Sequence, residues 1–233
     1  MRVVQIWRYP VKSMGGEQLD AAELHVDGID GDRTWGVVDL STGLVLTARR
    51  EPTLLFLSSS WRTGERPEVR TETGELVPDD AALSDVLSRP VRLRPATEGP
   101  GTFESPLVVD DAGHEREWIA WDSSGRTFHD GRSTVSIVST GTLGEWDPRR
   151  FRTNVVVDGG GEELLTGEVR IGSAVLAIRR PIDRCVMVTR AQPGIPSDPS
   201  VLRQLVSDRG NTLAIGATVA RPGRVETGDQ LGG

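Results

Sequence analysis

The stretch Phe151-Arg152-Thr153-Asn154-Val155-Val156-Val157 places three polar side chains directly before a run of β-branched valines. β-branched residues fit the pleated surface of a sheet, so residues 152–158 are expected to form a strand. Similar short runs, separated by turn residues, predict further strands at 2–9, 19–26, 34–40, 43–48, 53–60, 67–72, 90–94, 105–109, 134–139, 168–179, 184–190 and 212–221. Many short strands and few helices are typical of barrels and sandwiches. We therefore expect a mainly β fold of β-barrel type with a few short helices.

The helices expected from capping signals are short. They cover residues 79–88, 141–147 and 198–208; Asp79 is a candidate N-cap of the first, and Asp198 or Ser197 can cap the third. No internal repeat is visible.

Proline, glycine and acidic residues interrupt the pattern between about 95 and 118, and this segment is the best candidate for a linker. The chain would then form two closely packed modules, 1–110 and 111–233. In the alternative, Trp118 and Trp121 belong to a packed strand between the modules.

Composition restricts the class of protein. The chain has 233 residues, a net charge of −7 and a single cysteine. The negative charge argues against a general nucleic-acid-binding surface, and no run approaches the roughly 18 apolar residues of a membrane span. One cysteine excludes an internal disulfide and a cysteine-ligated iron–sulfur cluster within this sequence. With no leader pattern in the first residues, the expected location is the cytoplasm.

The motifs of several large enzyme classes are absent. The sequence has no His-Glu-x-x-His, no Walker phosphate loop, no Gly-x-Gly-x-x-Gly after a strand and no Gly-x-Ser-x-Gly. His25, His114 and His129 are scattered, and of these only His129 lies near a candidate site.

Two residues are unusual for their rarity. Lys12 is the only lysine among 27 lysine and arginine residues, and its ammonium is a point charge that the flat fork of an arginine does not replace. Cys185 follows Asp183 and Arg184. A lone cysteine is most often a buried, inert residue, but a neighbouring cation favours the thiolate, which binds soft or high-valent metals.

Five motifs in order resemble one family. Tyr9-Pro10-Val11-Lys12-Ser13, Asp32-Arg33-Thr34-Trp35 and Leu46 to Pro52 are similar to the N-terminal β-barrel domain found in proteins of the MOSC group, the molybdenum-cofactor sulfurase C-terminal-domain family. Phe151 to Val157 and Arg184-Cys185-Val186-Met187 are similar to that family's Phe-Arg-Pro-Asn-Ile-Val and Arg-Cys-Ile-Leu segments. The resemblance spans nearly the whole chain.

The resemblance implies a molybdenum cofactor, a molybdopterin that carries a phosphate. Cys185 would be the metal ligand and the catalytic residue. The cofactor-binding residues would be Lys12, Ser13, Arg33, Ser133, Thr134, Arg152, Asn154, Arg184 and Cys185. These residue types suit the group, because cations bind phosphate and an amide reads a pterin edge. Pyridoxal phosphate is not expected.

The activity implied is reduction of N-hydroxylated compounds, as in the mitochondrial amidoxime-reducing component and its bacterial relatives. The electrons would come from a separate ferredoxin- or flavin-type carrier, and no nucleic acid or membrane partner is expected. Two departures concern the pocket: Thr153 stands where the family has proline, and Val188-Thr189-Arg190 stands where well-known members have Thr-Thr-Val-Asp. Two alternatives stay open: a sulfur-carrier or cofactor-handling protein with a persulfide on Cys185, and a binding module that keeps the fold without the metal.

Overall fold

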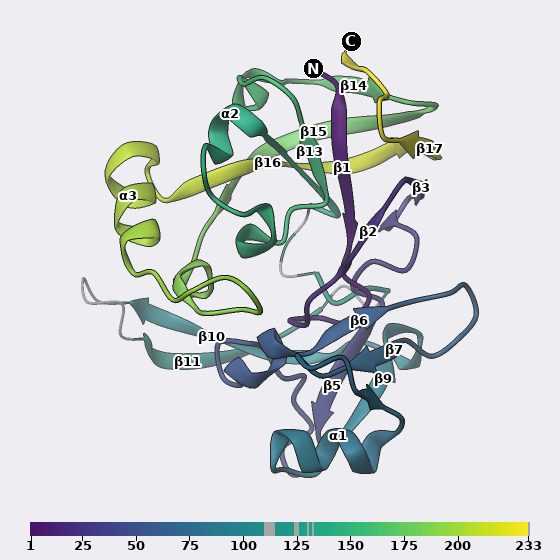
Figure 1. Cartoon of the computed structure of the whole chain (residues 1–233), viewed down its shortest axis with the longest axis vertical. Coiled ribbons are helices and arrows are strands. Elements are labelled where there is room, and N and C mark those ends of the chain that lie inside the picture. The colour runs from purple at the N-terminus through teal and green to yellow at the C-terminus, as the bar shows by residue number, and fades with distance from the viewer. Residues whose placement is uncertain (110–114, 124–125, 130, 132, 233) are drawn as a thin grey trace. The chain divides into compact units, whose positions relative to one another are not determined.

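The computed structural model describes residues 1–109, 115–123, 126–129, 131 and 133–232 (Figure 1). The chain divides into two compact units. Unit 1 consists of Met1–Arg8, Gly16–Asp32 and Gly131–Gly233, and unit 2 consists of Tyr9–Gly15 and Arg33–Asp130. No helix in the described part of the chain is long and apolar enough to cross a membrane.

An eight-stranded sheet forms the centre of unit 1. Only β12 and β13 pair in parallel; the other neighbours are antiparallel. The strands, in spatial order, are β18 (Leu231–Gly232), β14 (Glu168–Ile171), β15 (Ala174–Asp183), β16 (Thr212–Arg221), β12 (Val135–Ser139), β13 (Val155–Val157), β1 (Val3–Arg8) and β2 (Glu17–Leu19). A three-stranded sheet has the order β17 (Gly223–Glu226), β3 (Ala21–His25) and β4 (Gly28–Ile29).

The valine run of β13 is buried on both faces of the large sheet. Val155 and Val157 belong to one apolar cluster, together with residues of β1, β12 and β16. Val156 points the other way, into a cluster that contains Leu205 of α3 (Ser200–Arg209). This alternation is the period of a strand covered on both sides, which explains why the run has no polar residue.

Short helical segments complete unit 1. They are α2 (Thr140–Leu143) and the 3₁₀ helices η3 (Pro148–Phe151), η4 (Glu162–Leu164) and η5 (Val186–Thr189). Ser139 accepts a hydrogen bond from the Thr142 amide at 3.1 Å and caps α2.

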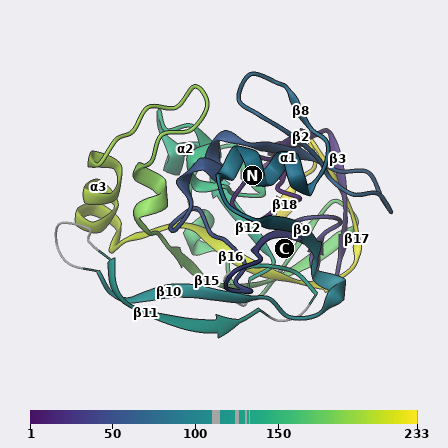
Figure 2. The same ribbon diagram turned by 90° about the horizontal axis from the view of Figure 1, so that it is seen from below.

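Unit 2 contains three small antiparallel sheets, and Figures 1 and 2 show that β10 and β11 form the longest ribbon among them. The pairs and triplets are β5 (Trp35–Asp39) with β9 (Val91–Pro95), β6 (Ser58–Ser60) with β7 (Glu68–Arg70) and β8 (Leu76–Val77), and β10 (Thr102–Val109) with β11 (Glu115–Asp122). The helical segments are α1 (Asp80–Leu87), η1 (Pro52–Phe56) and η2 (Ala96–Glu98). Phe103 and Phe128 are fully buried and meet edge to face, with ring centroids 5.9 Å apart.

The mainly β class is confirmed, but the strand order of the large sheet is open, with β18 and β2 at its ends, and does not close into a ring. The units also differ from the predicted contiguous modules 1–110 and 111–233. The N-terminal strands belong to unit 1 because β1 pairs with β13 and β3 pairs with β17. Strand pairing depends on contacts in space, so chain order alone did not reveal this division.

Several local predictions were wrong. Residues 43–48, expected to be a strand, contain only an isolated bridge from Val45 to Val38, and the first half of 53–60, also expected to be a strand, belongs to η1, which precedes the short strand β6. The segment 95–118, expected to be a linker, contains η2, β10 and the start of β11, apart from residues 110–114, which lie outside the described residues. Trp118 and Trp121 therefore lie on a strand. Residues 184–190, expected to be a strand, form η5 and its flanks, because β15 loses its partner where β16 begins: the last pair is Asp183 with Thr212.

Candidate functional site

Cys185 lies at the point where β15 has ended and η5 begins. Its backbone is extended, with φ −123° and ψ 177°, and its carbonyl accepts a hydrogen bond from the Val188 amide at 3.1 Å. The thiol is free and the residue is partly exposed. Cys185 is thus neither a buried core residue nor part of a regular strand.

Arg184 is held to the backbone of unit 1 both through its guanidinium and through its main chain. The guanidinium donates to Leu213 O from Nε at 2.8 Å and to Phe151 O from Nη1 at 2.9 Å. The main chain of Arg184 exchanges two hydrogen bonds with Asn211. These contacts hold the residue beside Cys185 in one conformation.

Arg152 has a left-handed backbone, with φ 53°, directly after η3. Such a conformation costs a non-glycine residue roughly 1–2 kcal/mol and persists where the surroundings impose it, often at functional sites. Ser13 and Arg33, two further predicted cofactor-binding residues, are left-handed as well, with φ 71° and 52°. Three of the seven left-handed non-glycine residues in the described part of the chain are therefore residues that the motifs single out.

Asn154 is held by hydrogen bonds on every side of its amide group. Its Oδ1 accepts from the amide and hydroxyl of Ser136, at 3.2 and 2.9 Å. Its Nδ2 donates to Trp7 O at 3.3 Å and to Asp32 Oδ2 at 3.1 Å. An amide has two donors and two acceptor sites, so these bonds fill its capacity. In this arrangement Asn154 orients the fully buried carboxylate of Asp32.

Ser133 and Thr134 enter β12 in a crowded part of unit 1. The Thr134 amide donates to Ala217 O at 2.9 Å. Gly28 and Gly216 leave the space for them, because a Cβ at Gly28 would meet Thr134 O at 2.6 Å and one at Gly216 would collide with Ser133 Oγ. The buried Thr134 Oγ1 has no hydrogen-bond partner among the residues that the structure describes. A buried hydroxyl in this state favours a ligand or water as its partner.

Lys12 and Arg33 lie close together in unit 2, joined through Phe128. The buried Lys12 ammonium donates to Phe128 O at 3.0 Å and lies 4.6 Å from the centroid of the Phe103 ring. The Phe128 amide donates to Arg33 O at 2.7 Å, and the Arg33 guanidinium lies over the Tyr9 ring. The Lys12 ammonium and the main chain of Arg33 are thus linked by a residue 95 or more positions away in sequence.

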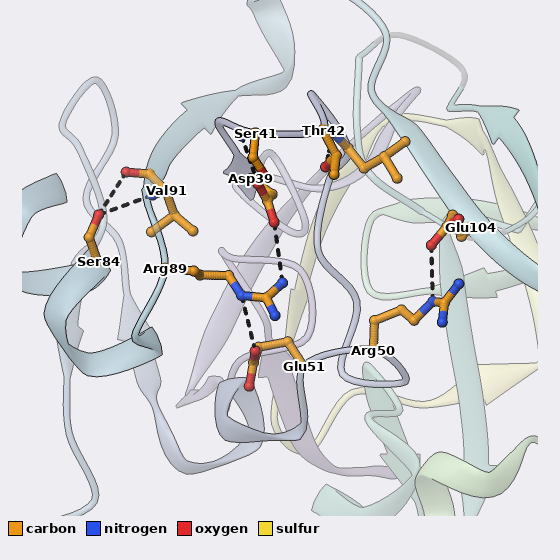
Figure 3. A network of polar contacts seen from close by, with 10 residues as sticks. Asp39, Ser41, Thr42, Arg50, Glu51, Ser84, Arg89, Val91 and Glu104 are labelled. Atoms are coloured by element: carbon orange, nitrogen blue, oxygen red, sulfur yellow. Dashed lines mark hydrogen bonds and ion pairs between the residues drawn. The ribbon is translucent and has the colours of Figure 1, made fainter.

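Ser13 receives its position from the motif of residues 46–52. Its Oγ accepts a hydrogen bond from the buried Ala48 amide at 3.0 Å. Figure 3 shows how the same motif is anchored: Arg89 lies between Asp39 and Glu51, with ion-pair distances of 3.2 and 3.6 Å. Glu51 in turn caps η1.

A pocket of about 280 Å³ adjoins this network. Two arginines, Arg50 and Arg89, and two carboxylates, Asp39 and Glu104, line it, so its charges balance. Hydrogen bonds from Ser41 lower the pKa of Asp39 against the opposing effect of burial, with a further contribution from Arg89. We assign this network the role of fixing the motif that positions Ser13.

Two sequence models cover most of the chain. The MOSC N-terminal beta barrel domain matches residues 1–92, and the MOSC domain matches residues 128–232. The chain belongs to the MOSC family. The motifs with Lys12, Ser13 and Arg33 fall in the first match, and those with Arg152, Asn154 and Cys185 fall in the second.

Curated relatives of this MOSC protein are distant and longer. It is 24% identical to the molybdenum cofactor sulfurase of Drosophila grimshawi and 22% identical to that of Drosophila mojavensis, over 94% and 99% of its own length. It spans about a third of the length of these relatives. Among solved structures, it resembles the YuaD protein from Bacillus subtilis, with a TM-score of 0.50, 19% identity and coverage of 99% of this chain and 93% of that one. The latter likeness concerns the fold.

The structure brings the predicted MOSC site residues together in two groups. Unit 1 contains Ser133, Thr134, Arg152, Asn154, Arg184 and Cys185, and unit 2 contains Lys12, Ser13 and Arg33. Among the described residues there is no cluster of three or more His, Cys, Asp or Glu side chains fit for a metal ion. The roles of the nine residues as cofactor ligands stay predictions.

Sequence reasoning missed three residues that organise these groups. Ser136 holds Asn154, Asp32 accepts from Asn154, and Phe128 joins Lys12 to Arg33. Asp32 was within a quoted motif and carried a usable signal. Ser136 and Phe128 act through partners distant in sequence, and no local pattern marks them.

Proposed function

We propose that this MOSC protein holds a molybdenum cofactor at Cys185 and reduces N-hydroxylated compounds with electrons from a separate carrier. The observation that carries the proposal is the coincidence of the family motifs with strained backbone: Ser13, Arg33 and Arg152 are all left-handed. Stability alone would favour glycine at such positions. A polar side chain at each of these three positions is consistent with a role for the side chain itself.

The donor set fits the cofactor. Cys185 offers a partly exposed thiol, Lys12 and the arginines offer cations for a phosphate, and the orphan hydroxyl of Thr134 offers a partner for a polar ring edge. When bound, the cofactor would supply two-electron redox chemistry at molybdenum. The protein residues would bind and orient it.

In this proposal the chain divides the work among its side chains. Cys185 ligates the metal, while Lys12, Arg33 and Arg152 neutralise the negative groups of the cofactor. Asn154 does not contact the ligand directly and keeps Asp32 in place. The overall reaction takes an amidoxime, two electrons and two protons to an amidine and water. The sequence has one cysteine, so we propose a ferredoxin- or flavin-type protein as the electron donor.

The test is turnover of benzamidoxime by protein purified from a molybdenum-replete host, with a reduced viologen dye as donor. We expect benzamidine from the wild type and none from Cys185→Ser. Arg180→Lys, an exposed change on β15, is the matched control and should keep the wild-type rate. Absence of turnover from molybdenum-loaded wild type would refute the reductase assignment.

A second function is favoured by the names of the two curated relatives, both molybdenum cofactor sulfurases. In this case Cys185 would carry a persulfide, or hold the cofactor for transfer to another enzyme. Mass spectrometry after incubation with a cysteine desulfurase and cysteine distinguishes the two. A gain of one sulfur on Cys185, together with no turnover from loaded protein, would shift the assignment to sulfur transfer.

A further inference from the structure

The guanidinium of Arg184 bonds two carbonyls that share one property. Leu213 O precedes Ala214, whose φ is 73°, and Phe151 O precedes Arg152, whose φ is 53°. Each acceptor therefore belongs to the peptide group that leads into a left-handed residue. The orientation of that peptide group depends on the φ angle of the next residue. A donor that holds the carbonyl in place therefore also restricts the φ angle of that next residue.

The main chain of Arg184 is tied to a third left-handed residue. Asn211 has φ 66°; its carbonyl accepts from the Arg184 amide at 2.9 Å, and its Nδ2 donates to Arg184 O at 2.8 Å. Where β16 pairs with the end of β15 the register is irregular between Thr212 and Ile215; Asn211 directly precedes this stretch and Ala214 lies within it. Bulges of this kind re-aim side chains next to active sites.

All of these contacts are made by Arg184, the residue directly before Cys185. Left-handed alanine, asparagine and arginine cost roughly 1–2 kcal/mol each relative to ordinary backbone, and they persist because neighbours over-determine them. Arg184 contacts the chain at each of the three. Its planar fork reaches two carbonyls on different segments at once, which a single ammonium on a flexible stem does not reproduce.

We propose that Arg184 is a positioning residue: it sets the backbone of Arg152 and Cys185 and does not itself bind the cofactor. The identity of the bound group rests on the proposed function, whereas the positioning rests on these contacts alone. The assignment of Arg184 to cofactor binding followed from the resemblance of Arg184-Cys185-Val186-Met187 to the family motif. Its donors to Leu213 O and Phe151 O give it a different role.

The test compares Arg184→Lys with Arg180→Lys in the full chain. The first readout is the ¹³Cα and ¹³Cβ chemical shifts of Arg152 and Ala214 in protein without cofactor, since these shifts report left-handed backbone. We expect both to leave the left-handed range in Arg184→Lys and to stay there in Arg180→Lys. Ser88, left-handed at the end of α1, is the internal control and should not change.

The second readout is the cofactor-loaded protein. A residue that supports metal ligands typically changes affinity or activity about 10- to 100-fold when replaced, so we expect pterin retention to fall by that factor and the Mo(V) EPR signal to shift in Arg184→Lys. A merely structural arginine would lower the unfolding midpoint and leave the EPR signal of the folded protein unchanged. Wild-type chemical shifts at Arg152 and Ala214 would overturn the proposal.

Two outcomes remain distinguishable from these. If the wild type binds no molybdenum, the proposed function fails, but the chemical shifts still test the positioning. If Arg184→Lys does not fold, Asn211→Gly replaces it, because glycine accepts the left-handed backbone and only the bond to Arg184 O is lost. A change in the chemical shifts of Arg152 in Asn211→Gly would support the proposal, and unchanged shifts would contradict it.

Discussion

Replacing Asn154 by aspartate tests the hydrogen-bond network at the centre of unit 1 with almost no change of volume. Oδ1 would still accept from Ser136. The second atom would change from a donor to an acceptor, facing Trp7 O at 3.3 Å and Asp32 Oδ2 at 3.1 Å. Two favourable bonds would become two repulsive contacts, one of them between carboxylates.

The magnitude follows from those contacts. Losing a neutral bond to Trp7 O costs about 1 kcal/mol, and losing a bond to the charged Asp32 costs about 1.5–3 kcal/mol. Repulsion between two carboxylates at this separation adds up to about 5 kcal/mol at an effective dielectric constant of 20, unless one takes up a proton. The two lost bonds alone give about 2.5–4 kcal/mol and the repulsion adds to this, so we expect a free-energy loss of at least about 3 kcal/mol for Asn154→Asp at pH 7, a large part of the stability of an average domain.

Urea unfolding followed by circular dichroism measures the loss. Gln204→Glu is the matched control: it makes the same amide-to-carboxylate change at an exposed position of α3 and should stay within about 0.5 kcal/mol of the wild type. A loss below about 1 kcal/mol at pH 7 would refute the assigned network.

Three further predictions address other parts of the chain. Ser88→Gly should stabilise the protein by about 1 kcal/mol in urea unfolding, because Ser88 is left-handed with φ 51°. The control Ser207→Gly, inside α3, should destabilise the protein by about 0.5 kcal/mol, and equal effects of the two substitutions would contradict the prediction. Asp39→Asn should cost about 1–2 kcal/mol at pH 7. Since Ser41 lowers the pKa of Asp39, that stability is present above the ordinary pKa of 3.8 and is lost as the pH falls further, so an equal cost at pH 3 would contradict the assignment. Lys12→Arg should reduce pterin content at unchanged formal charge, because the buried ammonium occupies a site that fits a point charge; equal pterin content would make Lys12 a structural residue only.

Local patterns predicted the elements whose causes are local. The valine run gave β13, and Asp79 gave the start of α1, where its side chain accepts from the Ala82 amide. Residues 184–190 were predicted as a strand because they are β-branched and apolar. The outcome instead depended on where β16 begins, which is information from a partner more than twenty residues away.

The candidate site divides in the same way. The motifs identified Arg152, Asn154 and Cys185. They did not show that Ser136, Trp7 and Asp32 occupy the hydrogen-bonding capacity of the Asn154 amide. A single sequence records which side chains are present and not which partners they choose. These hydrogen bonds could be identified only from the three-dimensional structure.

The proposed function requires that Cys185 binds a molybdenum cofactor. The most direct measurement is the molybdenum and pterin content of protein purified from a molybdenum-replete host, by metal analysis and by fluorescence of the oxidised pterin. We predict about one of each per chain in the wild type, and a clear loss of molybdenum in Cys185→Ser, which removes the soft ligand but little volume. Zinc or no metal in the wild type, or wild-type molybdenum in Cys185→Ser, would contradict the account.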